Sequence, residues 1–191
     1  MKKHLYVAVV VVGLLCGVSR DASAQDAPWR VLLDRWGFDA FVSVGTADWR
    51  IVDDTVTADA GNGYLVTREV FGDFELRAEF WVSPDANSGV FIRCSDPQVI
   101  TAANAYEVNI FDRRPDQTYR TGGIVNVAKV QATVDTGNKW NTMEIVARGG
   151  KMTVRVNGTP VSEGEDRKFA RGPIALQYGG GDVRFRKVEV R

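Results

Sequence analysis

Histidine and cysteine are nearly missing from this chain. Its 191 residues include one histidine and two cysteines, and both His4 and Cys16 lie in the first 24 residues, which have the features of a leader. A domain that follows this leader holds no histidine and only Cys94, which strand alternation places on the core side as an inert, buried thiol. We therefore expect no Ser-His-Asp or Cys-His catalytic group, no histidine-ligated zinc site and no internal disulfide.

The leader is indicated by three features in order. Lys2 and Lys3 precede an apolar run over residues 6–18, and residues 22–24, Ala-Ser-Ala, have the small-residue pattern of a signal-peptidase site. The run is shorter than the roughly 20 residues that span a bilayer, and the large Leu15 before Cys16 disfavours lipidation. The sequence predicts a signal peptide over residues 1–24, export to the periplasm or the exterior, and no membrane attachment after cleavage.

Neither sign of charge is in excess. The chain has 24 Lys and Arg residues against 24 Asp and Glu residues, and no basic run stands out. Because phosphate binding needs clustered positive charge, we do not expect a nucleic acid as partner. Residues 25–191 contain no internal repeat, low-complexity tract or linker, so they are expected to form a single domain.

Alternation of apolar and polar residues dominates the chain after residue 50. Over residues 74–82, apolar positions alternate with Glu75, Arg77 and Glu79, which is typical of a strand with one face on a core. The same period recurs further along, and Gly- and Asn-rich turns separate the segments. A short helix is expected within residues 29–36, and longer loops at residues 97–103 and 113–119. The pattern predicts an all-β fold, an antiparallel β-sandwich or jelly roll.

One predicted strand carries the polar residues of greatest interest. Glu107 and Asn109 lie on one face, about 7 Å apart, and the apolar residues between them face the core. Asp112 falls on the core side unless the strand bulges or ends before it. Arg93 ends another predicted strand and could form a cross-strand ion pair with Glu107. Solvent-facing strands carry such carboxylates for solubility alone, so this pattern leaves the role of Glu107 open.

Eight segments in order give the chain a resemblance to a known family. They lie at residues 71–76, 87–93, 106–112, 121–124, 140–141, 156–158, 172–177 and 185–188. From about residue 49 to residue 191 the chain resembles the 3-keto-disaccharide hydrolase domain family, whose fold is a concanavalin A-like, glucanase-type jelly roll. Two positions depart from the family pattern: Asn109 stands where glutamine is usual, and Tyr178 with a glycine run stands where a histidine often follows Gln177.

The resemblance implies an oligosaccharide or glycoside substrate whose sugar is oxidised to a ketone at C3. Such a ketone acidifies the hydrogen on C2, so a carboxylate can remove it. The enolate then expels the group on C1, and water adds in a second step to give net hydrolysis. On this basis we expect Glu107 to be the base, Arg93 to stabilise the enolate, and Asp112 to act as a second acid or base.

The remaining expected site residues bind the substrate or a metal ion. The expected substrate-binding residues are Asn109, Gln177, Tyr178 and Trp81. Trp81 could stack on a sugar ring or cover a neighbouring strand. If a cation takes part, Glu107 and Asp112 together with Asn109 offer oxygen ligands only, which suits Ca²⁺ or Mg²⁺ but not zinc.

Other functions stay open at the level of the sequence. A carbohydrate-binding module without catalytic activity is compatible with the same fold, and the missing histidine favours it. A laminarinase-like glycosidase needs two carboxylates about 5 Å apart for a retaining mechanism, and the spacing of Glu107, Asn109 and Asp112 fits that pattern poorly. A structural or cell-surface interaction domain fits least well, because the polar residues converge on one predicted strand face.

Overall fold

The computed structural model describes residues 27–191, so the predicted signal peptide lies outside the described residues. Within this range thirteen strands form two antiparallel sheets, and one 3-10 turn, η2 (Gln117–Tyr119), is the helical element. The predicted all-β, antiparallel sandwich is confirmed. No helix in residues 27–191 has the length and apolar character needed to cross a bilayer.

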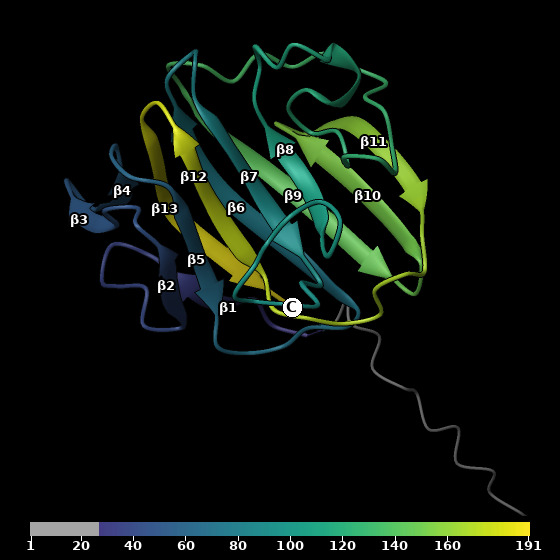
Figure 1. Ribbon diagram of the computed structural model, residues 1–191, viewed down its shortest axis with the longest axis horizontal. Coiled ribbons are helices and arrows are strands. Elements are labelled where there is room, and N and C mark those ends of the chain that lie inside the picture. Colours follow the sequence, from purple (N-terminus) through teal and green to yellow (C-terminus); the bar gives the residue numbers. More distant parts are fainter. Residues whose placement is uncertain (1–26) are drawn as a thin grey trace, which may run out of the picture.

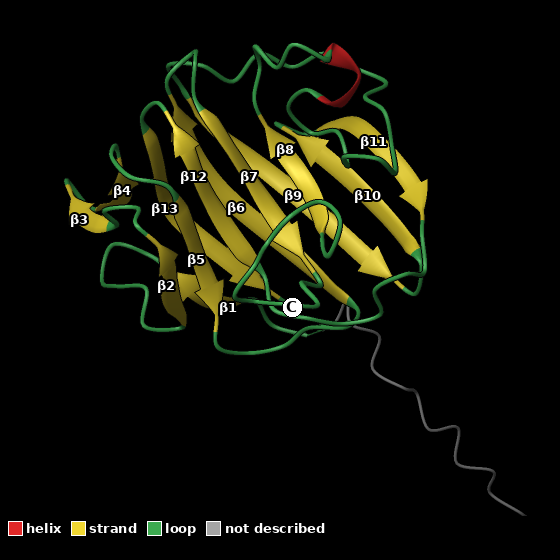
Figure 2. Cartoon of the chain, in the orientation of Figure 1, coloured by secondary structure: helices red, strands yellow, loops and turns green. Residues whose placement is uncertain are grey.

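The two sheets lie one in front of the other (Figure 1). The larger sheet is the back layer, in the order β11 (Thr159–Glu165), β10 (Lys151–Val156), β9 (Trp140–Arg148), β6 (Phe74–Val82), β13 (Val183–Val190), β4 (Thr55–Ala58) and β3 (Arg50–Val52), with β1 (Arg30–Leu33) paired to β13. The smaller sheet is the front layer, in the order β2 (Phe41–Gly45), β5 (Gly63–Thr67), β12 (Ala175–Gly180), β7 (Asn87–Ile92) and β8 (Tyr106–Ile110). Figure 2 shows how long connections join the strands at both ends.

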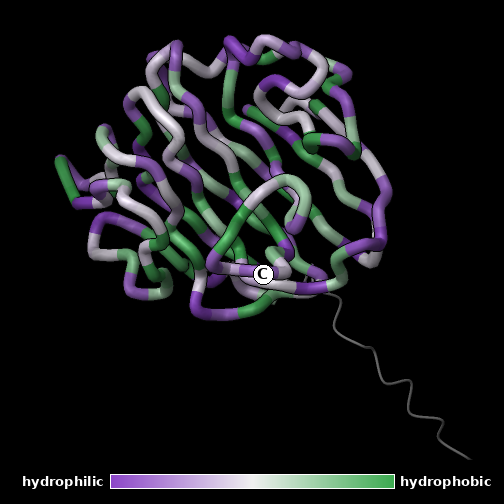
Figure 3. Tube along the Cα trace, in the orientation of Figure 1, coloured by the Kyte–Doolittle hydropathy of each residue, from purple (hydrophilic) through white to green (hydrophobic). Residues whose placement is uncertain are grey.

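The core fills the space between the two sheets. Apolar side chains at every second position point into it, as the period of a strand requires, and hydrophobic and hydrophilic residues alternate along the strands in Figure 3. On the smaller sheet, Leu65, Val90, Val108 and Leu176 belong to this core. The residues between them in sequence therefore point outward, away from the larger sheet. We call this surface the outward face.

A second apolar cluster covers part of the outward face. Val66, Phe91 and Ala175 supply its base, and Cys94 and Ile100 from the β7–β8 connection pack onto them. This connection, residues 93–105, arches in front of the smaller sheet in Figure 1. Its residues 97–103 contain no strand, as predicted.

Two local predictions are wrong. The expected short helix within residues 29–36 is instead β1, because residues 30–33 gain backbone hydrogen bonds by pairing with the end of β13. Cys94 is buried, as predicted, but it lies in the outward cluster rather than in the core. The cause is Arg93, whose φ of 54° breaks the alternation at the end of β7.

Candidate functional site

Glu107 and Asn109 lie on the outward face of β8, where alternation places them. The register of the strands sets Gly89 opposite Asn109, Gln177 opposite Gly89, and Tyr64 opposite Gln177. These four residues form one row across β8, β7, β12 and β5, and we call it the outward row. Because neighbouring strands are about 4.8 Å apart, the row spans about 14 Å. Glu107 stands beside this row, opposite Phe91.

The Glu107 carboxyl is partly buried and stands alone. It forms no hydrogen bond and no ion pair with any residue in the described part of the chain. Burial raises the pKa of Glu107 above its ordinary value, and the charge of Arg114 opposes this rise. A carboxyl group whose charged form is disfavoured by burial, and which forms no ion pair, has the properties of a general base or acid.

Two buried oxygen atoms of the outward row have no hydrogen-bond donor. They are Oδ1 of Asn109 and Oε1 of Gln177. Asn109 is held in place because its Nδ2 donates to the backbone oxygen of Tyr119 at 2.6 Å. A buried acceptor without a partner costs free energy, so the hydroxyl groups of a ligand placed here would relieve that cost.

Tyr64 and Gly89 complete the row. The Tyr64 hydroxyl donates to the backbone oxygen of Ile100 at 3.0 Å. Burial raises the pKa of Tyr64, and a hydrogen bond from Gln177 opposes the rise. A Cβ atom at Gly89 would lie 3.5 Å from Oε1 of Gln177 and 3.3 Å from the backbone oxygen of Val108. Glycine therefore keeps the space between the two amides free of a side chain.

Arg93 does not belong to this site, which corrects the prediction that it stabilises an enolate beside Glu107. Its side chain is 1% exposed and pairs with Asp73 at 3.1 Å. The guanidinium also donates, at 3.0, 2.6 and 3.3 Å, to the backbone oxygens of Gly72, Gly149 and Phe169. The positive φ of Arg93 turns the side chain toward these partners. Arg93 therefore ties together the end of the sandwich where β6 begins and β9 turns into β10.

Asp112 is also separate from Glu107. Strand β8 ends at Ile110, and the Asp112 carboxylate accepts from donors in a later loop. The backbone N–H groups of Thr136 and Gly137 donate at 2.6 and 3.2 Å, and the hydroxyls of Thr121 and Thr136 donate at 2.6 and 3.0 Å. The predicted role of Asp112 as a second acid or base beside Glu107 is thus corrected. Asp112 fastens the connection between β8 and β9.

The residues considered for Ca²⁺ or Mg²⁺ do not fit a cation. Glu107 and Asp112 lie in different surroundings, and the Asp112 oxygens already face four donors. Across residues 27–191, no group of three or more His, Cys, Asp or Glu side chains is arranged to hold a metal ion. We therefore derive no chemical step through a metal.

Tyr178 and Trp81, the other two residues expected to bind substrate, are not brought together with Glu107. Tyr178 is 3% exposed within the core, because it alternates with the outward-facing Gln177. Its ring meets Trp49 edge-on at 6.4 Å between centroids. Trp81 belongs to β6 of the other layer, where the guanidinium of Arg184 lies 4.5 Å from its ring centroid.

Three residues of this region, Tyr64, Gly89 and Arg114, do not stand out in the sequence. Tyr64 alternates with the core residue Leu65, so its outward direction could be inferred from the pattern. Its position beside Gln177 follows only from the pairing of β5 with β12, which joins segments more than a hundred residues apart.

Solved structures with the same fold include proteins linked to carbohydrates. A candidate glycosyl hydrolase from Parabacteroides distasonis is 21% identical, with a TM-score of 0.72 over 86% of this chain and 99% of that one. A second from the same organism is 13% identical, with a TM-score of 0.77 over 89% and 96%. The carbohydrate-binding module CBM66 from Bacillus subtilis is 16% identical, with a TM-score of 0.60 over 78% and 93%. At these identities the similarities show the fold alone.

The sequence comparison identifies the family. No curated protein sequence matches the chain. Residues 28–191, which are nearly all of the described residues, match the 3-keto-alpha-glucoside-1,2-lyase-like domain. The resemblance inferred from the eight ordered segments is thereby confirmed, and this chain belongs to the family of 3-keto-alpha-glucoside-1,2-lyase-like domains.

Proposed function

We propose that this protein cleaves 3-keto-glycosides by elimination across C1 and C2, with Glu107 as the base. The observation that carries the proposal is the Glu107 carboxyl, which is partly buried on the outward face, has no partner, and has a raised pKa. The family supports the substrate class, because its members are described as 3-keto-alpha-glucoside-1,2-lyase-like domains.

The reaction needs a base, stabilisation of a negative charge, and a proton for the leaving oxygen. Glu107 removes the proton on C2, and the electron pair of the C–H bond spreads over C2, C3 and the ketone oxygen as an enolate. The enolate collapses to a C1–C2 double bond as the C1–O bond breaks, and the leaving oxygen takes a proton from a water molecule, which becomes hydroxide. This hydroxide then adds to C1, and Glu107, whose partly exposed carboxyl exchanges its proton with solvent, returns a proton to C2. The sum is hydrolysis with the carboxylate regenerated.

Arg114 takes the electrostatic role that the sequence assigned to Arg93. Its charge acts on Glu107, its side chain is half-buried, and it forms no salt bridge with a described residue. A fixed positive charge near the base lowers the free energy of the enolate relative to the neutral ketone. The amides of Asn109 and Gln177 bind sugar hydroxyls through their unpaired oxygens.

Turnover of a 3-keto-disaccharide by purified protein tests the proposal. We expect monosaccharide release by the unaltered protein, none by Glu107→Gln, and a large fall in kcat for Arg114→Gln. Arg113→Gln, which removes the neighbouring exposed arginine, should leave kcat unchanged. Absence of turnover in the unaltered protein, or full turnover by Glu107→Gln, would overturn the proposal.

A non-catalytic carbohydrate-binding module is the second candidate. The unpaired oxygens of Asn109 and Gln177 favour it, because they suit sugar binding whether or not chemistry follows. Calorimetric titration separates the two functions. A binding module shows sugar affinity without release of products in the unaltered protein, whereas an enzyme loses turnover on Glu107→Gln and keeps its affinity.

We also propose that the chain is exported and that its leader is cleaved after Ala24. The support is the sequence pattern of residues 1–24, which lie outside the described residues. N-terminal sequencing of protein secreted by a bacterial host is expected to start at Gln25. Intact residues 1–24 in the recovered protein would contradict this proposal.

A further inference from the structure

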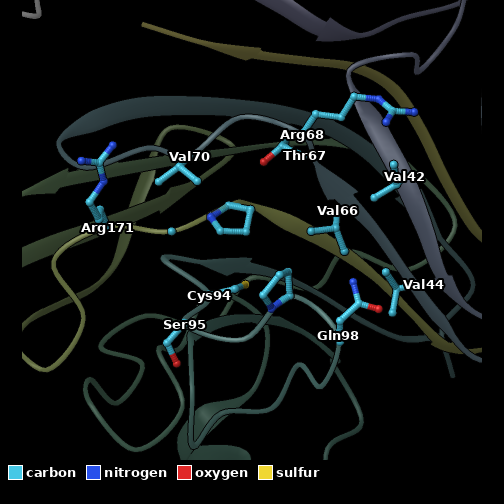
Figure 4. Close-up of a pocket in the computed structure, with 13 residues that line it drawn as sticks. Val42, Val44, Val66, Thr67, Arg68, Val70, Cys94, Ser95, Gln98 and Arg171 are labelled. Carbon is cyan, nitrogen blue, oxygen red and sulfur yellow. The ribbon is translucent and has the colours of Figure 1, made fainter.

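A separate recess opens on the outward face between the β7–β8 connection and β2. It has a volume of about 560 Å³, which is within the range of pockets that bind small molecules. Val42 and Val44 of β2 and Val66 of β5 form its floor, and Val70 forms part of its wall (Figure 4). The recess therefore offers an apolar surface made of branched aliphatic side chains.

The lining of this recess is unsuited to a sugar. None of its thirteen residues is aromatic or acidic, so it provides neither a ring for stacking nor a carboxylate for hydroxyl groups. Cys94 lies at the recess, and burial raises the pKa of its thiol to about 12. The thiol is therefore neutral at physiological pH and adds no negative charge.

Two arginines stand at the edge of the recess. Arg68 and Arg171 lie on different sides of the valine floor in Figure 4. The Nε of Arg68 donates to the backbone oxygen of Asp39 at 3.0 Å. Neither guanidinium is paired with a carboxylate in the described part of the chain, and both side chains are exposed. An uncompensated positive edge above an apolar floor favours a ligand that is apolar and negatively charged.

We propose that this recess binds a small amphipathic carboxylate, with its apolar body on Val42, Val44 and Val66 and its carboxylate at Arg68 and Arg171. The site is distinct from Glu107, because Phe91 and Ala175 stand between Glu107 and Val66 in one cross-strand row, and Glu107 does not line the recess. The inference therefore does not depend on the function proposed above.

Isothermal titration of the protein with decanoate, and with decanamide as its uncharged match, tests the proposal. We expect decanoate to bind, and decanamide to bind about tenfold more weakly because it lacks the charge that the exposed arginines attract. The double variant Arg68→Gln, Arg171→Gln should lose about tenfold in decanoate affinity and little in decanamide affinity. Arg155→Gln with Arg167→Gln, which changes two exposed arginines that do not line the recess, should bind decanoate like the unaltered protein.

Val70→Glu tests the location. Val70 is 43% exposed, so the variant is expected to fold, and its carboxylate should prevent decanoate binding. Equal affinity for decanoate and decanamide, unchanged binding by the arginine double variant, or unchanged binding by Val70→Glu would each overturn the proposal, as would the absence of any decanoate binding.

Discussion

At the scale of single residues, Glu107 differs from the other carboxylates of this protein. Surface carboxylates such as Glu69 and Glu163 pair with cations, whereas the partly buried Glu107 has no such partner among residues 27–191. Burial raises its pKa, so the folded state binds the Glu107 proton more tightly than the unfolded state does. The contribution of Glu107 to the free energy of unfolding is therefore at its maximum when the pH is below the pKa of this group in the unfolded chain. It is lost as the pH rises through the higher pKa of the folded protein.

The first prediction concerns the pH dependence of stability. Glu107→Gln removes the ionisation, so this variant should become more stable relative to the unaltered protein as pH rises from about 4 to 7. Urea unfolding of both proteins at several pH values measures the difference in unfolding free energy. A difference that stays constant across this range would show that ionised Glu107 costs the folded protein nothing.

The second prediction concerns Cys94. Its side chain is 2% exposed, and burial raises the pKa of the thiol to about 12. Because the thiolate is the reactive form, iodoacetamide at pH 8 should leave the native protein unmodified and alkylate it only after unfolding in urea. Intact-mass spectrometry reads the result. Rapid alkylation of the native protein would mean that the outward cluster opens readily.

At the scale of structural elements, Arg93 and Asp112 hold connections in place. Arg93 joins the end of β7 to the start of β6 and to the β9–β10 turn. Asp112 joins the end of β8 to residues 136–137. Both side chains provide hydrogen-bond partners for backbone groups outside the strand ladders.

The third prediction is that Arg93→Met destabilises the fold strongly. It removes hydrogen bonds to three backbone oxygens and leaves them without donors, so we expect a loss of about 3 kcal/mol in unfolding free energy. Guanidinium unfolding measures it, with Arg155→Met at an exposed position as the control. A loss no larger than that of the control would contradict the structural role assigned to Arg93.

The fourth prediction is that Asp112→Asn loosens the β8–β9 connection. The side-chain amide of Asn has one oxygen, so it cannot accept the hydrogen bonds that both carboxylate oxygens of Asp112 accept. We therefore expect a loss of about 1–3 kcal/mol in unfolding free energy. Hydrogen exchange should quicken in residues 121–137 more than in β6 or β9. Added Ca²⁺ should not raise the thermal midpoint of either protein, since the oxygens of Asp112 already face donors. Uniformly unchanged exchange would count against this account of Asp112.

Alternation along the strands was sufficient to predict which face of β8 carries Glu107 and Asn109. It could not predict that Arg93 leaves the pattern, because a positive φ at a residue other than glycine depends on the packing around it. Local sequence also does not determine strand register. The contact of Gln177 with Gly89 and Tyr64 depends on β12 pairing between β7 and β5, a long-range pairing that only the folded chain specifies.

At the scale of the whole molecule, the two layers have different roles. The larger sheet buries one face on the core, and its other face is covered by ion pairs and by arginine–tryptophan contacts such as Arg184 on Trp81 and Arg186 on Trp140. The smaller sheet leaves its outward face with an unpaired carboxyl, unpaired amide oxygens and an apolar recess. The chemistry we propose therefore lies on the smaller sheet.

The central claim is that Glu107 removes the C2 proton of a 3-keto-glycoside. The most direct test incubates a 3-keto-disaccharide with the protein in D₂O and follows C2 of the released sugar by NMR. We expect deuterium at C2 with the unaltered protein, and neither deuterium nor product with Glu107→Gln, which should still bind the substrate. Product released without deuterium at C2, or deuterium incorporated by Glu107→Gln at the unaltered rate, would contradict the claim.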